Sequence, residues 1–121
     1  MADKKPKVVT TASSGTLYQS GAIRDNEGKV RWDLLPYDAL DSIARILTDG
    51  ASEYGDRNWE KGFPWTSVFA SLIRHLTAWM LGEDTDRKSG RLHLAHAGCN
   101  VLFLLAFYLR KTGTDDRVKV K

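Results

Sequence analysis

The histidines of the chain fall at spacings that could build a reactive site. His93, His96 and Asn100 are three and four residues apart, so on a helix they share one face. The rest of that helix, from Val101 to Leu109, is apolar apart from one tyrosine hydroxyl. Because an unpaired polar group is costly to bury, this stripe must face polar partners, water or a metal ion.

Acidic residues stand just before this stretch, at a place where plain helix electrostatics disfavours them. Glu83 and Asp86 follow a helix that ends near Gly82, and each carboxylate at a helix C-terminus opposes the macrodipole by ~0.3–1 kcal/mol. A bound cation would compensate these charges, and imidazoles on the next helix could share it. The candidate catalytic and metal-binding residues are therefore Glu83, Asp86, His93 and His96.

The remaining histidine, His75, lies in the preceding helical segment. A short loop makes the two helices antiparallel neighbours, and His75 is ~10 Å before Gly82 along the helix axis. His96 and Asn100 lie a comparable distance into the next helix, so His75 could face either of them. A lone histidine at the edge of an apolar stripe is more often structural, and both interpretations stay open.

Hydrophobic periodicity predicts three helices. Apolar residues recur at helical spacing over residues 36–54, 64–81 and 89–110, and Ser89 is a candidate N-cap for the third helix. No segment of the body alternates strongly enough to predict a strand. We therefore predict an all-α fold, an antiparallel bundle of three main helices.

The ends of the chain differ from this body. Residues 1–20 and 112–121 are polar and show no period, so we expect flexible tails around one domain over 21–111. Because the third helix is apolar all round from Val101, it must be central or covered by another subunit. We expect a homo-oligomer, either a dimer or a tetramer.

Charge and composition limit the function classes. The net charge of +3 comes from the ends, because residues 1–10 carry +2 and residues 110–121 carry +3, which leaves the body at −2. Nucleic-acid binding is therefore not expected. No apolar run could span a membrane and no signal peptide opens the chain. With Cys99 as its lone cysteine, the chain suits the cytoplasm.

A loop between glycines at positions 55 and 62 mixes charged, amide and indole side chains, as a nucleotide-gripping loop would. Trp59 could stack on a purine or simply cap the core, and both interpretations stay open. Glu53 belongs to an acidic row that could help to hold Mg²⁺ or form a solvated face. The candidate substrate-binding residues are Tyr54, Arg57, Asn58, Trp59, Lys61, His75 and Asn100.

These residue types suit the hydrolysis of a nucleotide by metal-bound water. Oxygen ligands favour Mg²⁺ or Mn²⁺, and imidazoles shift the preference toward transition metals. A divalent ion neutralises phosphate charge and activates water. The chain has no Walker loop, no Gly-x-Ser-x-Gly, no His-Glu-x-x-His and no His-Asp dipeptide. Cys99 lies in too apolar a helix to act as a nucleophile.

Two motif blocks of the sequence, together with a short stretch before them, resemble a known family. The run from Gly50 to Gly62 is similar to small phage-encoded proteins described as the N-terminal domain of dATP/dGTP diphosphohydrolases. Residues 29–36 and the run from Gly82 to Asn100 look like the same family. The resemblance covers roughly residues 21–108, and the order and spacing of the two blocks are fairly specific.

The resemblance implies an all-α fold related to MazG-like nucleoside triphosphate pyrophosphatases. It also implies cleavage of dGTP or dATP to the monophosphate and pyrophosphate with Mg²⁺ or Mn²⁺, in phage nucleotide metabolism and thus in a host cytoplasm. MazG-like enzymes hold the metal with Glu-x-x-Glu and Glu-x-x-Asp pairs, whereas this chain offers His93 and His96, so those ligands do not transfer. The alternative is a non-catalytic accessory bundle that binds nucleotide or a protein partner.

Overall fold

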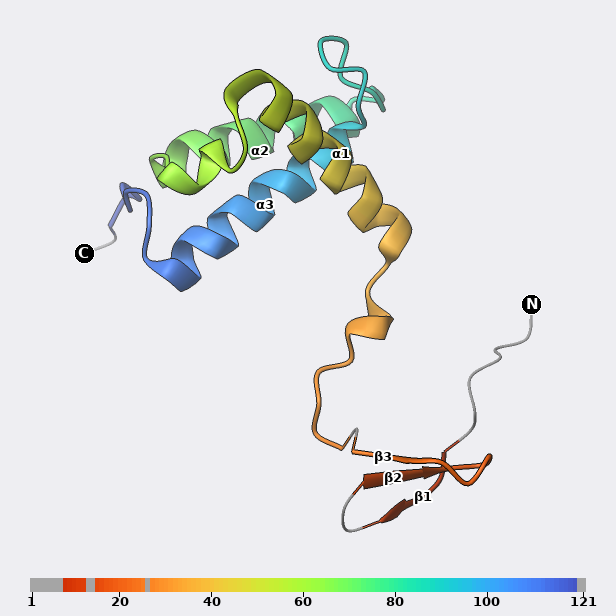
Figure 1. Cartoon of the computed structure of the whole chain (residues 1–121). Helices are drawn as coiled ribbons and strands as arrows, with labels where there is room; N and C mark the ends of the chain where they lie inside the picture. The colour runs from red at the N-terminus through yellow and green to blue at the C-terminus, as the bar shows by residue number, and fades with distance from the viewer. Residues whose placement is uncertain (1–7, 13–14, 26, 120–121) are drawn as a thin grey trace. The chain divides into compact units, whose positions relative to one another are not determined.

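The computed structural model describes residues 8–12, 15–25 and 27–119 (Figure 1). These residues belong to two compact units, Met1–Leu35 and Pro36–Lys121. The division falls after Leu35, whereas the sequence suggested a tail ending near residue 20. The parts of the two expected tails at residues 1–7, 13–14 and 120–121 lie outside the described residues.

The predicted helices are present in the second unit as α1 (Tyr37–Tyr54), α2 (Trp65–Met80) and α3 (His93–Arg110). Two short 3-10 helices, η1 (Trp32–Leu34) and η2 (Asn58–Lys61), precede α1 and α2. Among the described residues, no helix is both long and apolar enough to cross a membrane. The prediction of a largely helical fold is thus confirmed.

The first unit carries a small antiparallel sheet in the order β1 (Val8–Ala12), β2 (Gly15–Tyr18) and β3 (Ile23–Arg24). Leu17 is the register partner of Thr10 on one side and of Ile23 on the other. The all-α prediction therefore missed this small sheet in the described residues of the segment. Its valines and threonines favour extended backbone, but strand pairing depends on partners that a single-segment pattern does not reveal.

Helix α3 lies between the other two helices of its unit. Ala95 and Cys99 lie on one face of this helix and Ala97 lies on the opposite face, yet all three are buried. Phe107 is fully buried and Val68 of α2 is also in the core. On the α1 side, a Cβ built on Gly98 would lie 2.8 Å from Ile43 Cδ1. The small residues of α3 therefore let α1 and α2 approach it closely, as expected of a central helix.

The start of α3 differs from the prediction. The helix begins at His93 after Leu92, which caps it without a side-chain hydrogen bond, so Ser89 is not its N-cap. Instead, Asp86 Oδ1 accepts the backbone N–H groups of Lys88 at 2.8 Å and Ser89 at 3.1 Å. These hydrogen bonds hold the backbone after Asp86 in a non-helical turn. The helix therefore begins at His93, later than predicted.

The C-terminal segment also makes contacts that were not predicted. The indole N–H of Trp65 donates to Thr112 O at 3.0 Å, and the Trp65 backbone N–H donates to Thr114 O at 2.9 Å. Asp116 accepts the backbone N–H of Thr66 at 2.9 Å and its hydroxyl at 2.6 Å. Pro64 offers no side-chain acceptor to the start of α2, so a distant aspartate caps it. Residues 112–116 therefore contact the start of α2, and the flexibility expected of this tail stays a prediction.

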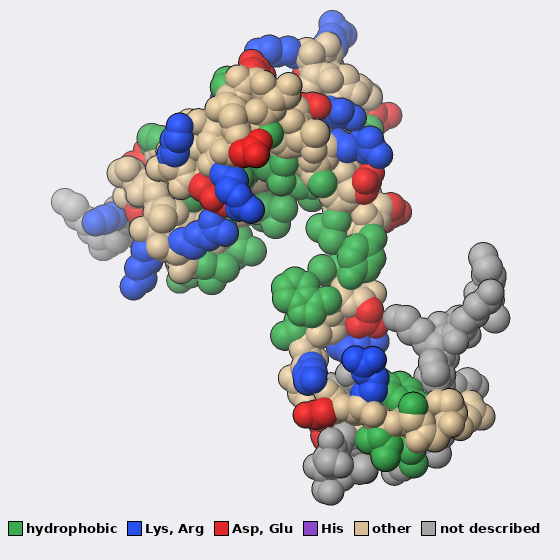
Figure 2. Space-filling model, viewed as in Figure 1, with side chains coloured by type: hydrophobic (Ala, Val, Ile, Leu, Met, Phe, Trp, Pro, Cys, Tyr) green, Lys and Arg blue, Asp and Glu red, His purple; other side chains and the backbone are tan. Residues whose placement is uncertain are grey.

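The second half of α3 leaves apolar side chains at the surface of its unit. The exposed fraction of these side chains ranges from 41% at Leu102 to 70% at Leu109. The other exposed residues of this part of α3 are Val101, Leu105 and Tyr108. Figure 2 shows hydrophobic side chains at the surface of the helical unit in this view. The prediction that another subunit covers this helix stays a prediction.

Candidate active site

The loop between α2 and α3 brings a carboxylate and two imidazoles into one hydrogen-bonded row. His93 Nε2 lies 2.8 Å from Glu83 Oε1, and His93 Nδ1 lies 2.9 Å from His75 Nδ1. His93 is only 5% exposed, so both of its ring nitrogens are engaged within the protein. The sequence placed His93 and Glu83 together, and the structure adds His75 to the centre of the group.

This row fixes where the protons sit when the histidines are neutral. An ionised Glu83 only accepts, so His93 Nε2 carries its proton and His93 Nδ1 accepts. His75 Nδ1 must then donate to His93 Nδ1 across the 2.9 Å contact. Glu83 thereby selects the tautomer of His93 that turns a lone pair toward His75.

Asp86 completes the group from the loop. Its Oδ1 is occupied by the two turn amides, and its Oδ2 lies 3.8 Å from His75 Nδ1. The hydrogen bond from the Ser89 backbone N–H, followed by that from Lys88, lowers the pKa of Asp86. The carboxylate is therefore ionised at neutral pH, and one oxygen remains for His75 or a bound cation.

His96 stands beside this group on the next turn of α3. Its ring stacks on His75 with centroids 4.4 Å apart and planes 4° from parallel. Ser89 Oγ lies 2.7 Å from His96 Nε2 and accepts the Arg91 backbone N–H at 3.1 Å. The serine hydroxyl is therefore free to donate its own proton to His96 Nε2, which makes His96 a neutral acceptor.

Burial keeps both stacked imidazoles neutral. It is the largest cause that lowers the pKa of His75, and the neighbouring His96 lowers it further. Burial likewise lowers the pKa of His96, against the opposing effect of Asp86. Since both values fall below the ordinary 6.5, the two rings can serve as proton acceptors or metal ligands at pH 7.

The group also fits a divalent cation. His75, Asp86 and His93 each offer one ligand atom within 4.8 Å of the others, the metal-compatible cluster found among the described residues. Two nitrogens at ~2.1 Å from one ion and at a right angle would lie ~3.0 Å apart, close to the 2.9 Å between the two Nδ1 atoms. Binding would release the proton that these nitrogens share.

The kinds of ligand atom in this group determine which metal ions it would bind best. Two imidazoles and one carboxylate favour a transition metal such as Mn²⁺ over Mg²⁺. Glu83 contacts the far nitrogen of His93, so it would orient that ligand and would not bind the ion through the same side. The expected ligand set of Glu83, Asp86, His93, His96 and Glu53 stays a prediction. In the structure His75 lies beside Asp86 and His93, and the His96 ring stacks on His75.

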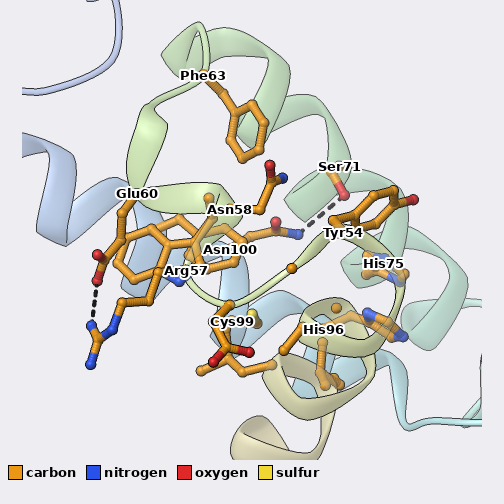
Figure 3. Close-up of a pocket in the computed structure, with 18 residues that line it drawn as sticks. Tyr54, Arg57, Asn58, Glu60, Phe63, Ser71, His75, His96, Cys99 and Asn100 are labelled. Atoms are coloured by element: carbon orange, nitrogen blue, oxygen red, sulfur yellow. Dashed lines mark hydrogen bonds and ion pairs between the residues drawn. The ribbon is translucent and has the colours of Figure 1, made fainter.

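The histidines open into a cavity of about 720 Å³ between α1, η2, α2 and α3 (Figure 3). Its volume lies in the range of small-molecule sites, ~300–1,000 Å³. His75 and His96 form part of its wall, and Asn58, Asn100 and Tyr54 line it as well. Six of the seven proposed substrate-binding residues, all except Lys61, therefore line one cavity.

The loop residues divide between the cavity and other contacts. Trp59 lines the cavity but stacks on Phe103 with ring centroids 4.7 Å apart, and Arg110 lies 5.5 Å from its ring. This geometry fits the core-capping interpretation of the indole. Arg57, whose backbone is left-handed with φ 58°, pairs with Glu60 at 2.8 Å.

Two predicted site residues lie apart from the group. Lys61 is exposed and does not belong to the cavity wall. Glu53 is exposed on α1 and outside the metal-compatible cluster. The Glu53 carboxylate instead accepts a hydrogen bond from the Tyr54 hydroxyl, which raises the pKa of Tyr54.

Sequence reasoning missed several contacts that hold the site. Arg91 pairs with Asp49 of α1 through two contacts of 2.9 and 3.0 Å, which ties the loop to another helix. Asn100 Nδ2 donates to Ser71 Oγ at 3.2 Å. Ser71 precedes His75 by one helical turn, and that spacing could have identified it, whereas no local pattern links residues 49 and 91.

Comparison with known proteins identifies the family. A family model described as "dATP/dGTP diphosphohydrolase, N-terminal" matches residues 19–117. The chain belongs to this family. The resemblance seen in the two sequence blocks is thereby confirmed.

Relatives of this dATP/dGTP diphosphohydrolase N-terminal family member are longer proteins. A "dATP/dGTP diphosphohydrolase" of Salmonella phage PMBT28 is 27% identical over 95 residues, which cover 78% of this chain and 32% of the relative. A "Glutamate-1-semialdehyde 2,1-aminomutase" of Leptospira biflexa serovar Patoc is 38% identical over 98 residues, which cover 70% of this chain and 21% of that protein. The chain thus spans a third or less of these relatives. No solved structure matches, so the MazG-like relation stays a prediction.

Proposed function

We propose that the chain hydrolyses the purine deoxynucleoside triphosphates dGTP and dATP to the monophosphate and pyrophosphate at its histidine cluster. The observation that carries the proposal is the cluster of His75, Asp86 and His93 beside a nucleotide-sized cavity. Membership of the family and the name of the phage relative support this substrate class.

A divalent ion, Mn²⁺ or Mg²⁺, would be held by His75, Asp86 and His93. When bound, it would neutralise phosphate charge and make a water molecule more acidic. Glu83 holds the proton on His93 Nε2, which keeps the other nitrogen of that ring available. Among the described residues that line the cavity, Arg57 is the one lysine or arginine, and it is paired with Glu60.

His96 and Ser89 supply the proton acceptor. Water attacks the α-phosphorus, the bond from that phosphorus to the bridging oxygen breaks, and pyrophosphate leaves with the bond's electrons. The proton released by the water passes to Ser89 Oγ, while the serine proton moves to His96 Nε2 at 2.7 Å. A neutral His96 with a lowered pKa is suited to this role near pH 7.

A second candidate is a non-catalytic module that binds a nucleotide or a protein partner. It is favoured by one observation: a related segment makes up 21% of a Leptospira protein whose name denotes a different activity. In that case the histidines would stabilise the fold, and the cavity would bind its ligand without turnover.

A panel of deoxynucleoside triphosphates separates these candidates. The purified chain is incubated with each triphosphate and Mn²⁺ or Mg²⁺, and the products are separated by anion-exchange chromatography. We expect dGTP or dATP to yield the monophosphate and pyrophosphate. Release of single phosphates would contradict the α-phosphorus attack, and binding of a purine triphosphate without any product would favour the second candidate.

A further inference from the structure

The middle of the cavity carries two side-chain amides, between the histidines and the apolar walls. Asn58 is the first residue of η2, and Asn100 lies on α3 one turn after His96. Both are half-buried and line the same cavity, as Figure 3 shows. They come from segments far apart in the sequence, so the fold itself brings the two amides to one chamber.

The hydrogen bonds of these amides are incomplete. Asn100 Nδ2 donates to Ser71 Oγ at 3.2 Å, which fixes the orientation of the amide and leaves its oxygen and second N–H for another partner. Within the described part of the chain, the Asn58 amide has no hydrogen-bond partner. The open amide groups of Asn58 and Asn100 are therefore available to a ligand or water in the cavity.

We propose that Asn58 and Asn100 bind the hydrogen-bonding edge of the purine base and thereby set the base preference of the site. This inference rests on the proposed function, because it takes the phosphates to lie at the histidines. An amide presents an acceptor and a donor side by side, and asparagine pairs in this way with adenine. Guanine offers an equivalent neighbouring pair, N1–H and O6.

The spacing along α3 favours an arrangement with the phosphates at the histidines and the base at the two amides. Asn100 is four residues beyond His96, a rise of ~6 Å, which leaves room for a deoxyribose between a phosphate at the histidines and a base at the amides. A purine extends farther from the sugar than a pyrimidine does. A pyrimidine fixed by the same phosphates would leave the amides unpaired, and a site built to hydrogen-bond its ligand discriminates strongly against one that cannot.

The aromatic alternative is less suited to reading the base. Trp59 stacks on Phe103 at 4.7 Å and has the Arg110 guanidinium 5.5 Å from its ring. A base could stack on the indole only by displacing one of these contacts. The cavity wall also includes apolar side chains of α1, such as Ile46 and Leu47, which would cover a base without choosing among bases.

Binding of deoxynucleoside monophosphates without added metal tests the proposal apart from catalysis. Affinities of the whole chain for dGMP, dAMP, dCMP and dTMP are measured by isothermal titration calorimetry. We expect purines to bind at least about tenfold more tightly than pyrimidines. Asn58→Ala and Asn100→Ala should each weaken purine binding about tenfold, the effect of about one hydrogen bond, and leave pyrimidine binding nearly unchanged.

Further variants separate base reading from folding. Asn58→Asp keeps the shape but removes both N–H donors, so it should also lose the purine preference. Gln19→Ala deletes an exposed amide in the other unit and should change no affinity. Melting temperatures of all variants confirm that they fold, and Asn58, which lacks a protein partner, keeps the test informative even where Asn100→Ala does not fold.

The outcomes distinguish this inference from the proposed function. Lost purine preference in the Asn58 variants supports base reading even where the wild-type chain hydrolyses no triphosphate, and in that case only the proposed function fails. Hydrolysis of dGTP or dATP together with an unchanged purine preference in Asn58→Ala and Asn58→Asp overturns the base-reading proposal alone. Equal binding of all four monophosphates by the wild-type chain overturns it as well.

Discussion

Glu83 contacts the nitrogen of His93 that faces away from His75, at 2.8 Å. Because this contact sets the proton position on a candidate metal ligand, we expect Glu83→Ala to weaken Mn²⁺ binding by about 10–100-fold. The side chain of Glu83→Gln can still accept a hydrogen bond from the His93 Nε2–H group. This variant should therefore lose less Mn²⁺ affinity than Glu83→Ala. Titration followed by electron paramagnetic resonance of free Mn²⁺ measures both variants, and equal affinity in wild type and Glu83→Ala would contradict the orienting role.

The thiol of Cys99 is 3% exposed, and burial raises its pKa from 9.0 to about 11. At a given pH this leaves roughly 100-fold less thiolate than an ordinary cysteine has, and the thiolate is the reactive form. We therefore expect slow reaction with a disulfide reagent in the folded chain and rapid reaction in denaturant. Equally fast labelling in both conditions would show that this part of α3 is open to solvent.

The sequence predicted the proximity of Glu83, Asp86 and His93 for a simple reason. All three belong to one short loop and the helix that follows it, so local spacing constrains them strongly. It could not predict the pairing of Asp49 with Arg91, because that contact depends on how α1 packs on α3. It also could not place His75 beside Asp86 and His93, because the orientation of these rings depends on tertiary contacts.

At the level of elements, the start of α2 depends on the C-terminal segment. Asp116 accepts two hydrogen bonds from Thr66, and these lower the pKa of Asp116 below 3.8. A carboxyl with a lowered folded-state pKa adds stability above its unfolded pKa, and that stability is lost as the pH falls through the folded value. Asp116→Ala should therefore lower the melting temperature at pH 7 but have little effect near pH 2.

Thermal unfolding followed by circular dichroism across this pH range checks the prediction. Arg117 and Asp115 form a separate pair, so Asp115→Ala is a neighbouring control that removes a charge without removing the cap. A melting temperature of Asp116→Ala that matches wild type at pH 7 would mean that the segment does not support α2. Sequence periodicity could not reveal this cap, because donor and acceptor are fifty positions apart.

At the level of the whole molecule, the second half of α3 exposes apolar side chains that another subunit could cover. Leu105 is 51% exposed and Leu109 is 70% exposed, and adjoining apolar side chains of this kind are typical of protein interfaces. We expect a dimer or tetramer in solution, measured by light scattering at micromolar concentration. Leu105→Glu should shift the chain toward monomer, and a monomeric wild-type chain would contradict the prediction.

The most direct test of the catalytic account compares Asp86→Asn with wild type in Mn²⁺-dependent hydrolysis of dGTP. The asparagine oxygen can still accept the amides of Lys88 and Ser89, so the turn and the melting temperature should be nearly unchanged. Loss of the charge should lower turnover by more than about 100-fold, since a proposed ligand is removed. Turnover equal to that of wild type, in a variant that melts at the same temperature, would contradict the histidine cluster as the site of hydrolysis.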